Sequence, residues 1–208
     1  EPLLDAARSA PSPETRLALC REAVQQFPAR PESWFELGLA LQAGHRPAEA
    51  ANAFARVLQA APGAAPVWTN LGAALTDAGQ PLQALQALDM AVSIDPALAA
   101  AETNRAVALR ELGRVEEALA ACERALALAP DDPAALSNRS TCRLLLGDLE
   151  GGFSDYENRW RIEPGLSQRR DFDVPLWLGE GEVAGKTVLI HPEGGFGDTI
   201  NFCRYAPL

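Results

Sequence analysis

Positively charged side chains other than arginine are almost missing from this sequence of 208 residues, which contains one lysine, Lys186, and two histidines, His45 and His191. The formal net charge at pH 7 is −10. Nucleic acids and anionic membranes both bind basic protein faces, so this balance argues against either as the main partner. A membrane-spanning helix is suggested by an apolar run of about 18 residues, and the sequence shows no such run. No signal peptide is visible either. We therefore expect a cytoplasmic protein that binds neither nucleic acid nor membrane.

Groups that could hold a metal or a cofactor are also scarce. The sequence has four cysteines, which lie far apart and form no C-x-x-C pair: Cys20, Cys122, Cys142 and Cys203. Such spacing suits reduced core thiols better than a disulfide framework or a zinc site. The segment around Lys186 lacks the upstream glycine of a phosphate-binding loop, and Ile200 replaces the third glycine of a dinucleotide fingerprint. We expect no metal and no cofactor.

What the sequence does have is an internal repeat. Five of the 16 prolines are spaced by 34 residues: Pro28, Pro62, Pro96, Pro130 and Pro164. Other residue types keep the same phase, among them Trp34 with Trp68 and the three alanines Ala50, Ala84 and Ala118. With 48% hydrophobic residues, the chain has ample material for a core. A fixed period of this length indicates a repeat architecture.

Each period contains two apolar stripes at helical spacing, separated by a short turn. In the first full period the stripes are formed by Trp34, Leu37 and Leu41 and then by Ala50, Phe54 and Val57. The pattern predicts a helical hairpin, in which the small residues Gly38, Gly72 and Ala106 allow the paired helices to approach closely. A single hairpin buries only one side, so successive hairpins must stack. We expect Ala50, Ala84 and Ala118 to be buried where helices cross.

A step of 34 residues with W-x-x-L-G at its head and proline at its end resembles the tetratricopeptide repeat. The resemblance implies an all-α fold, a right-handed superhelix of helical hairpins. We place four units at 31–64, 65–98, 99–132 and 133–166, and interpret residues 1–30 as a degenerate extra unit or cap. Residues 167–186 are then a linker.

One polar residue recurs on the first helix of the units, which is expected to line the inner groove: Asn70, Asn104 and Asn138. An amide both donates to and accepts from an extended peptide backbone, and repeats about 10 Å apart would meet such a peptide about every three residues. A similar asparagine ladder occurs in the tetratricopeptide arrays of O-linked N-acetylglucosamine transferases. The alternative is that the asparagines satisfy neighbouring helices. Neighbouring polar residues complete the predicted peptide site: Thr69, Thr103, Ser137 and Arg110. Glu36 takes the place in the first unit and interrupts the ladder.

The fourth unit departs from the pattern, because Gly151 and Gly152 open its second helix. Large aromatic residues follow at Phe153, Tyr156 and Trp160. We weigh two roles for this stripe, namely packing the end of its own repeat and docking a following domain.

The end of the chain differs from the repeats. Residues 187–191 have strand composition, and a G-x-G-D turn at 195–198 leads into helical sequence. Residues 170–208 resemble the junction at which bacterial tetratricopeptide arrays are fused to a heptosyltransferase-like glycosyltransferase of two Rossmann domains. We expect residues 187–208 to be a strand-loop-helix remnant of that α/β domain. We also expect the chain to be a fragment, and a homodimer formed by strand pairing through this segment.

In the heptosyltransferase-like family the aspartate of that turn acts as general base, which would assign the role to Asp198. Capping of the helix that begins at Thr199 is the simpler role for this carboxylate. Because most of the catalytic domain is absent, we expect no enzyme activity from this chain.

Three functions follow as hypotheses. The first is a protein- or peptide-binding scaffold that forms the recruiting arm of a larger bacterial glycosyltransferase, and the second is an enzyme in its own right. The third is an adaptor for acidic peptides or C-terminal carboxylates. The adaptor would need arginines in place of the lysines of known carboxylate clamps, and the candidates are Arg105, Arg110, Arg139 and Arg143.

Overall fold

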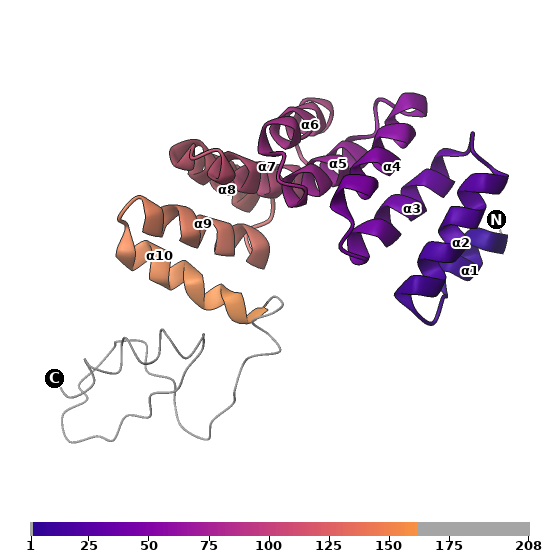
Figure 1. The fold of residues 1–208 in the computed structure, drawn as a ribbon. Helices are drawn as coiled ribbons and strands as arrows, with labels where there is room; N and C mark the ends of the chain where they lie inside the picture. The colour runs from indigo at the N-terminus through magenta and orange to yellow at the C-terminus, as the bar shows by residue number, and fades with distance from the viewer. Residues whose placement is uncertain (1, 162–208) are drawn as a thin grey trace, which may run out of the picture. The chain divides into compact units, whose positions relative to one another are not determined.

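The computed structural model describes residues 2–161 of the chain (Figure 1). In this range it contains ten α-helices and one short 3₁₀ helix, and no strand. The helices are α1 (Pro2–Arg8), α2 (Pro13–Gln26), α3 (Pro31–Ala43), α4 (Pro47–Ala60), α5 (Ala65–Asp77), α6 (Pro81–Ile94), α7 (Ala99–Glu111), α8 (Val115–Leu128), α9 (Pro133–Leu145), α10 (Leu149–Tyr156) and the 3₁₀ helix η1 (Glu157–Arg161). The all-α expectation is confirmed.

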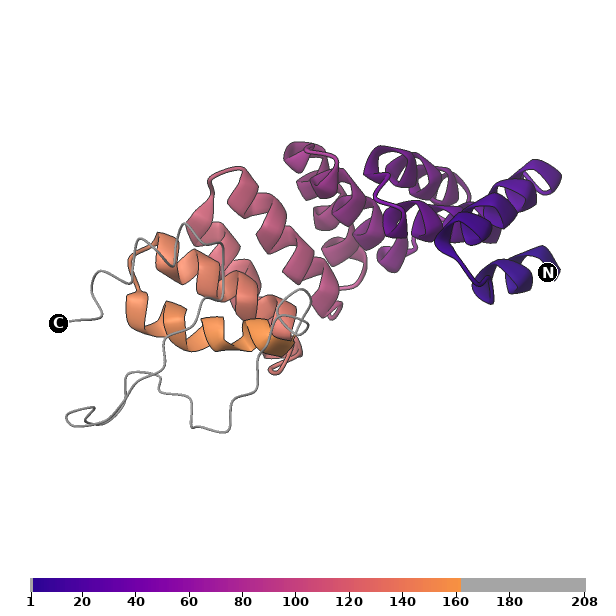
Figure 2. The same ribbon diagram turned by 60° about the horizontal axis from the view of Figure 1, so that its bottom comes forward.

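The helices form hairpins that stack in chain order. Each odd-numbered helix packs against the even-numbered helix that follows it, and each hairpin packs against the next (Figures 1 and 2). The first helices of neighbouring hairpins also touch, α5 with α7 and α7 with α9. Residues 2–158 belong to one compact unit. The expected solenoid of helical hairpins is therefore present, and α1 and α2 add a hairpin at its start whose first helix has only seven residues. We number the hairpins that follow it from the first (α3 and α4) to the fourth (α9 and α10).

Prolines mark the start of most helices and tryptophans hold the connections between hairpins. Proline stands at the first helical position of α2, α3, α4, α6 and α9, where its missing N–H costs no hydrogen bond. The indole Nε1 of Trp34 donates to the Pro28 carbonyl oxygen at 2.8 Å, and Trp68 donates to Pro62 at the same distance. Pro28 and Pro62 thus each accept a hydrogen bond from the hairpin that follows.

The turn within each hairpin requires a left-handed residue. Gly79, Gly113 and Gly147 have φ between 70° and 86°, and His45 occupies the equivalent place with φ 54°. A left-handed conformation is easily adopted by glycine but strained for histidine.

The core depends on a size match between the two helices of a hairpin. A Cβ added to Gly38 would lie 2.6 Å from the Phe54 ring, and one added to Gly72 would lie 2.8 Å from Leu88 Cδ2. The third hairpin has alanine at this place, Ala106, and a smaller residue opposite it, Cys122. Ala50, Ala84 and Ala118 are fully buried. Both the close approach and the buried alanines were predicted from the repeat, and both are confirmed.

The fourth hairpin breaks this match. Ser140 stands where the first two hairpins have glycine, and its hydroxyl donates to the Gly152 carbonyl oxygen at 2.8 Å. The residue opposite is Tyr156, which is 42% exposed, whereas Phe54 and Leu88 at this place are fully buried. A side chain on Ser140 leaves no room for a ring between the helices, so the tyrosine remains outside.

No helix in residues 2–161 is both long and apolar enough to cross a membrane.

Candidate functional site

The predicted ladder lies on four first helices. Its four members share one repeat position and belong to α3, α5, α7 and α9: Glu36, Asn70, Asn104 and Asn138. Helix α5 packs against α7, and α7 packs against α9, so the three asparagines line one continuous surface. We call this surface the asparagine face and define it by Asn70, Asn104, Asn138 and Arg110.

Two of the asparagines have hydrogen-bonding capacity to spare. Asn70 and Asn104 are half-buried, and within the residues that the structure describes neither amide has a hydrogen-bond partner. Asparagine is a weak helix former, so its presence in the middle of two helices is not explained by local stability. The two amides are free to donate to and accept from a ligand.

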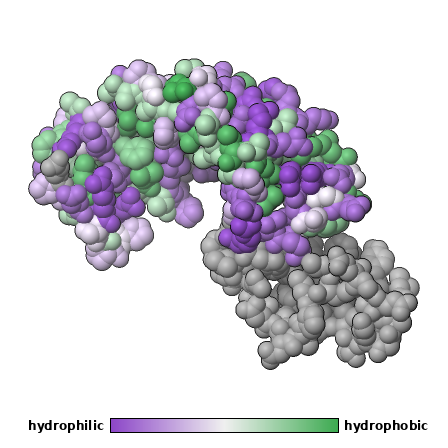
Figure 3. All heavy atoms as spheres, turned by 180° about the vertical axis from the view of Figure 1, so that it is seen from behind, coloured by the Kyte–Doolittle hydropathy of each residue, from purple (hydrophilic) through white to green (hydrophobic). Residues whose placement is uncertain are grey.

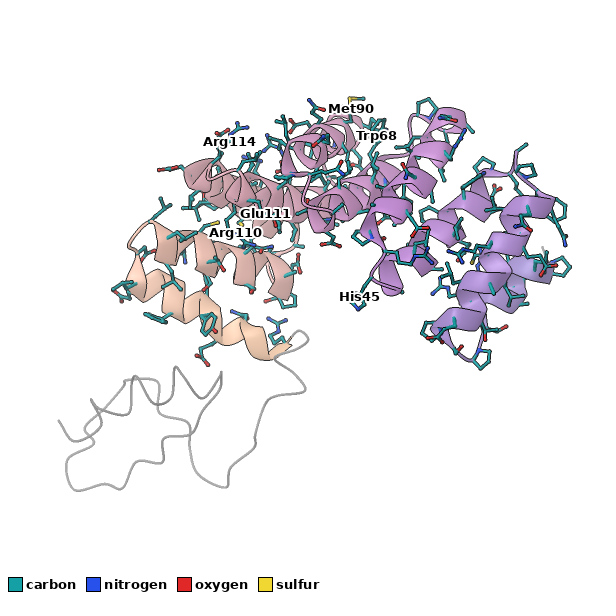
Figure 4. The ribbon with its side chains drawn as sticks, viewed as in Figure 1. His45, Trp68, Met90, Arg110, Glu111 and Arg114 are labelled. Carbon is teal, nitrogen blue, oxygen red and sulfur yellow. The ribbon has the colours of Figure 1, made fainter. Side chains whose placement is uncertain are left out.

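The third asparagine is held by an arginine of the preceding hairpin. Arg110 Nη1 on α7 donates to Asn138 Oδ1 on α9 at 3.2 Å. In Figure 4 Arg110 lies where α7 meets α9, whereas Arg114 lies away from that junction. For Asn138, a neighbouring helix therefore supplies a partner, as the alternative role of the ladder required. Arg110 itself has no carboxylate partner within the described part of the chain.

The hydroxyls beside the ladder are less available. Thr69 and Thr103 are buried, and their hydroxyls donate to the carbonyl oxygens of Ala65 and Ala99 one helical turn earlier. Thr103 also bonds Asp132 Oδ2 at 3.2 Å. Ser137 is half-buried and lies next to Asn138. Of these three predicted site residues, Ser137 alone has a hydroxyl without an internal acceptor in the described residues.

Glu36 closes one end of the ladder. Its side chain is buried and bonds Arg8 Nε at 2.7 Å and Arg16 Nη2 at 3.3 Å, both from the N-terminal hairpin. A buried carboxylate needs such partners because desolvation of an unpaired charge is costly. The interruption of the ladder in the first unit thus serves the attachment of α1 and α2.

Three of the four arginines considered for an adaptor are already paired. Arg139 makes a two-pronged bond to Asp155, with both N···O distances at 2.7 Å, and Arg143 bonds the same carboxylate at 2.9 Å. Arg105 pairs with Asp89 at 2.6 Å. Arg110 is the remaining cation of this set.

Sequence reasoning missed the pair between Glu102 and Arg124. Glu102 occupies the repeat position of Trp34 and Trp68, is buried, and accepts from Arg124 Nε at 2.6 Å and Nη2 at 3.1 Å. The sequence did contain a sign of this pair, because a charged residue stands at a repeat position that holds tryptophan in the two preceding units. The pair replaces a packing contact by an ionic one and lies within the third hairpin.

The thiols in the described range are buried and free: Cys20, Cys122 and Cys142. A hydrogen bond with Cys122 lowers the pKa of Cys142 to about 7; burial opposes this shift and the charge of Arg110 supports it. The hydrogen bond with Cys142 and burial raise the pKa of Cys122. Within residues 2–161 no group of histidine, cysteine and carboxylate side chains is arranged to hold a metal.

Exposed apolar side chains gather on the last hairpin. They include Leu145, Leu149 and Phe153, each about 60% exposed, and Tyr156. On the face shown in Figure 3, hydrophobic and hydrophilic residues are interspersed. The two roles weighed for the aromatic stripe, end packing and docking, remain predictions, since residues beyond 161 lie outside the described range. The same holds for Asp198, for the strand at 187–191 and for a dimer through residues 187–208.

Comparison with known proteins bears on the repeats. Family models described as tetratricopeptide repeat match residues 16–65, 35–99 and 99–132, which together exceed half of the 208 residues. A comparison with curated proteins gave no match.

Solved structures share the fold at low identity. TTC0263, described as a thermophilic TPR protein of Thermus thermophilus, is 21% identical with a TM-score of 0.65, over 78% of this chain and 91% of that chain. MamA 41-end from Desulfovibrio magneticus RS-1 is 21% identical with a TM-score of 0.63, over 81% and 93%. YrrB, described as a TPR protein with an unusual peptide-binding site, is 21% identical with a TM-score of 0.59, over 78% and 86%. At these identities the likeness shows the fold alone.

Proposed function

Because the chain belongs to the tetratricopeptide repeat proteins, we propose that it is a scaffold that binds an extended peptide or protein segment along the asparagine face. The observation that carries the proposal is the pair of amides on Asn70 and Asn104, which are half-buried, share one repeat position and have no hydrogen-bond partner in the described residues. An extended peptide presents alternating N–H and C=O groups that a carboxamide satisfies in both directions. YrrB, a neighbour in fold, is described as having a peptide-binding site, which agrees with this use of the architecture.

The test is a peptide selection followed by substitution. Random 12-residue peptides displayed on phage are selected against the full chain, and the affinity of a selected peptide is measured by fluorescence anisotropy. Asn70→Ala combined with Asn104→Ala removes one hydrogen bond at each of two amides, each worth about 0.5–1.5 kcal/mol, so we expect roughly 5- to 160-fold weaker binding. Alanine is the better helix former, so the fold should be retained.

A matched control uses an asparagine elsewhere on the array. Asn52 is exposed on α4, and Asn52→Ala should leave the affinity within twofold. Failure to select any peptide, or equal affinity for the double variant and the parent chain, contradicts the proposal.

The recruiting arm of a bacterial glycosyltransferase is the finer form of this function. Its support is the resemblance of residues 170–208 to a fusion junction, together with the position of that segment directly after the repeats. Cytoplasmic location and homodimer formation stay predictions of the same kind. The parent enzyme is tested by sequencing the reading frame downstream of this chain. A downstream sequence without a second Rossmann pattern contradicts the glycosyltransferase proposal.

A further inference from the structure

Two of the buried thiols lie where one hairpin packs against the next. The repeat places a large apolar residue on the second helix of a hairpin and an alanine 20 residues later, on the first helix of the next hairpin. The three pairs of this kind are Phe54 with Ala74, Leu88 with Ala108, and Cys122 with Cys142. Both members of each pair belong to the same core cluster. In the third pair the large residue and the alanine are both replaced by cysteine.

The sizes of these cysteines are explained by packing, but their sulfur atoms are not. Cys122 is smaller than Leu88 and Cys142 is larger than Ala108, and an apolar pair of the same total volume would fill the space equally well. The two thiols are fully buried and share a hydrogen bond across the contact between α8 and α9. The third pair therefore brings together two groups that can form a covalent bond with each other.

Neighbouring charges favour the reactive form of the pair. The hydrogen bond with Cys122 lowers the pKa of Cys142 to about 7, burial opposes this shift, and the charge of Arg110 supports it. Cys122 keeps its proton because the hydrogen bond and burial raise its pKa against the charges of Arg110 and Arg139. The thiolate is the form of cysteine that attacks an oxidant. Cys142 is thus the nucleophile of the pair, and Cys122 is the thiol that reacts with it afterwards.

We propose that Cys122 and Cys142 form a reversible disulfide on exposure to hydrogen peroxide, and that this bond ties the third hairpin to the fourth. The Cys142 thiolate attacks one peroxide oxygen, the O–O bond breaks, and the leaving hydroxide takes up a proton to become water. The Cys122 sulfur then attacks the resulting sulfenic acid, so that the S–S bond forms and the S–O bond breaks. The second oxygen leaves as water with the Cys122 proton. In total two thiols lose two electrons and two protons, and one peroxide becomes two waters.

Peroxide reaches the buried pair when the fourth hairpin opens locally. Its second helix, α10, has 8 residues, whereas α4, α6 and α8 have 14 each. Tyr156 lies outside the contact with Ser140 instead of filling the space between the helices. Local opening occurs where packing is weakest, so this hairpin is the place for it. A disulfide from α8 to α9 closes a loop of the chain and restricts further opening.

The first experiment identifies the bond. The full chain is treated with hydrogen peroxide, which is then removed by catalase, and remaining thiols are blocked with N-ethylmaleimide in denaturant. Trypsin releases Cys122 in peptide 115–124 and Cys142 in peptide 140–143. We expect mass spectrometry to find these two peptides joined, two hydrogen atoms lighter than their sum, and separated again by dithiothreitol. Blocked thiols at both positions, or a disulfide to Cys20 or Cys203 instead, overturn the proposal.

The variants use residues that the array already contains. Cys142→Ala restores the alanine of the preceding pairs, so the fold should be retained, as checked by circular dichroism, while the joined peptides disappear. Cys20→Ala is the matched control, because it removes a fully buried thiol from the N-terminal hairpin. The yield of the joined peptides should stay within twofold in this control. Their loss in Cys20→Ala contradicts the assignment to Cys122 and Cys142.

The second experiment measures the effect of the bond on the array. Hydrogen exchange of α9 is compared in the oxidised and the reduced chain without any peptide ligand, so the result does not depend on the proposed peptide binding. Oxidation should slow the exchange roughly 10- to 100-fold, because the cross-link restricts the opened state. Dithiothreitol should reverse the effect, and Cys142→Ala should not show it. Exchange that is unchanged or faster in the cross-linked chain overturns the proposal that the bond ties the two hairpins together.

Discussion

The size match between paired helices predicts that two destabilising substitutions partly rescue each other. In the second hairpin a Cβ on Gly72 would overlap Leu88 Cγ and would lie 2.8 Å from Leu88 Cδ2. The third hairpin accommodates that Cβ because it has Cys122 where the second has Leu88, and both Ala106 and Cys122 are buried. The perturbation is therefore Gly72→Ala, Leu88→Cys and their combination, which gives the second hairpin the pair found in the third.

The expected change in the free energy of unfolding is a balance between overpacking, helix propensity and cavity formation. Overpacking at Gly72→Ala costs about 1–3 kcal/mol, while the better helix propensity of alanine returns about 1 kcal/mol. Leu88→Cys leaves a cavity in a fully buried place and should cost about 2–3 kcal/mol, near the low end for truncating leucine. In the double variant the new methyl group occupies part of that cavity. We expect it to be more stable than the sum of the single effects predicts, by about 1–2 kcal/mol.

The assay is urea unfolding followed by circular dichroism, with hydrogen exchange of α5 and α6 as the local readout. Repeat arrays unfold with limited cooperativity, so the local measurement assigns the change to its hairpin. Gly63→Ala is the control, because nothing lies within 4 Å of a Cβ at that position. Additive effects, within about 0.5 kcal/mol, would refute the reasoning.

Three further substitutions test the helix crossing and the left-handed turn of the repeat. Ala84→Leu should overpack a fully buried helix crossing and cost about 1–3 kcal/mol, and an unchanged melting curve would contradict the crossing. His45→Gly should raise stability by about 0.5–1 kcal/mol, because it removes a left-handed histidine at the price of a more flexible unfolded chain. Gly79→Ala, at the equivalent turn, should lower it, and melting curves that move in the same direction for both variants would refute the strain.

Much of the fold was accessible from the sequence because a period constrains every unit at once. The spacing of Pro28, Pro62 and Pro96 and the phase of Ala50 and Ala84 determine the register of the helices, and the structure has the expected eight helices from Pro31 to Tyr156. The short α1 was not resolved from the sequence, since the first half of residues 1–30 lacks the repeat pattern. Its attachment depends on Arg8 and Arg16 meeting Glu36, which is a tertiary contact.

The chemistry of the candidate site was less accessible, because it depends on which side chains are already satisfied. The sequence identified Asn70, Asn104 and Asn138 as equivalent, but it held no sign that Arg110 reaches the last of them from the preceding hairpin. From the sequence, Arg139 and Arg143 were also candidates for ligand-binding cations, whereas in the structure both bond Asp155. Pairing of this kind is set by the distance between hairpins, which residue identity alone does not reveal.

The length of peptide that would fit the proposed site on the asparagine face follows from where pairing within the protein ends. At α3 the ladder position is filled by Glu36 and its two arginines, so a peptide meets no free amide there. The amides on α5 and α7 have no partner in the described residues, and the amide on α9 is bonded through its oxygen to Arg110. These three helices touch in chain order. Hairpins spaced by about 10 Å correspond to about three residues of extended peptide each, so three rungs would bind a segment of roughly six to nine residues in the proposed complex. Because Arg110 bonds the amide oxygen of Asn138, the last rung would differ from the other two and would meet one end of that segment.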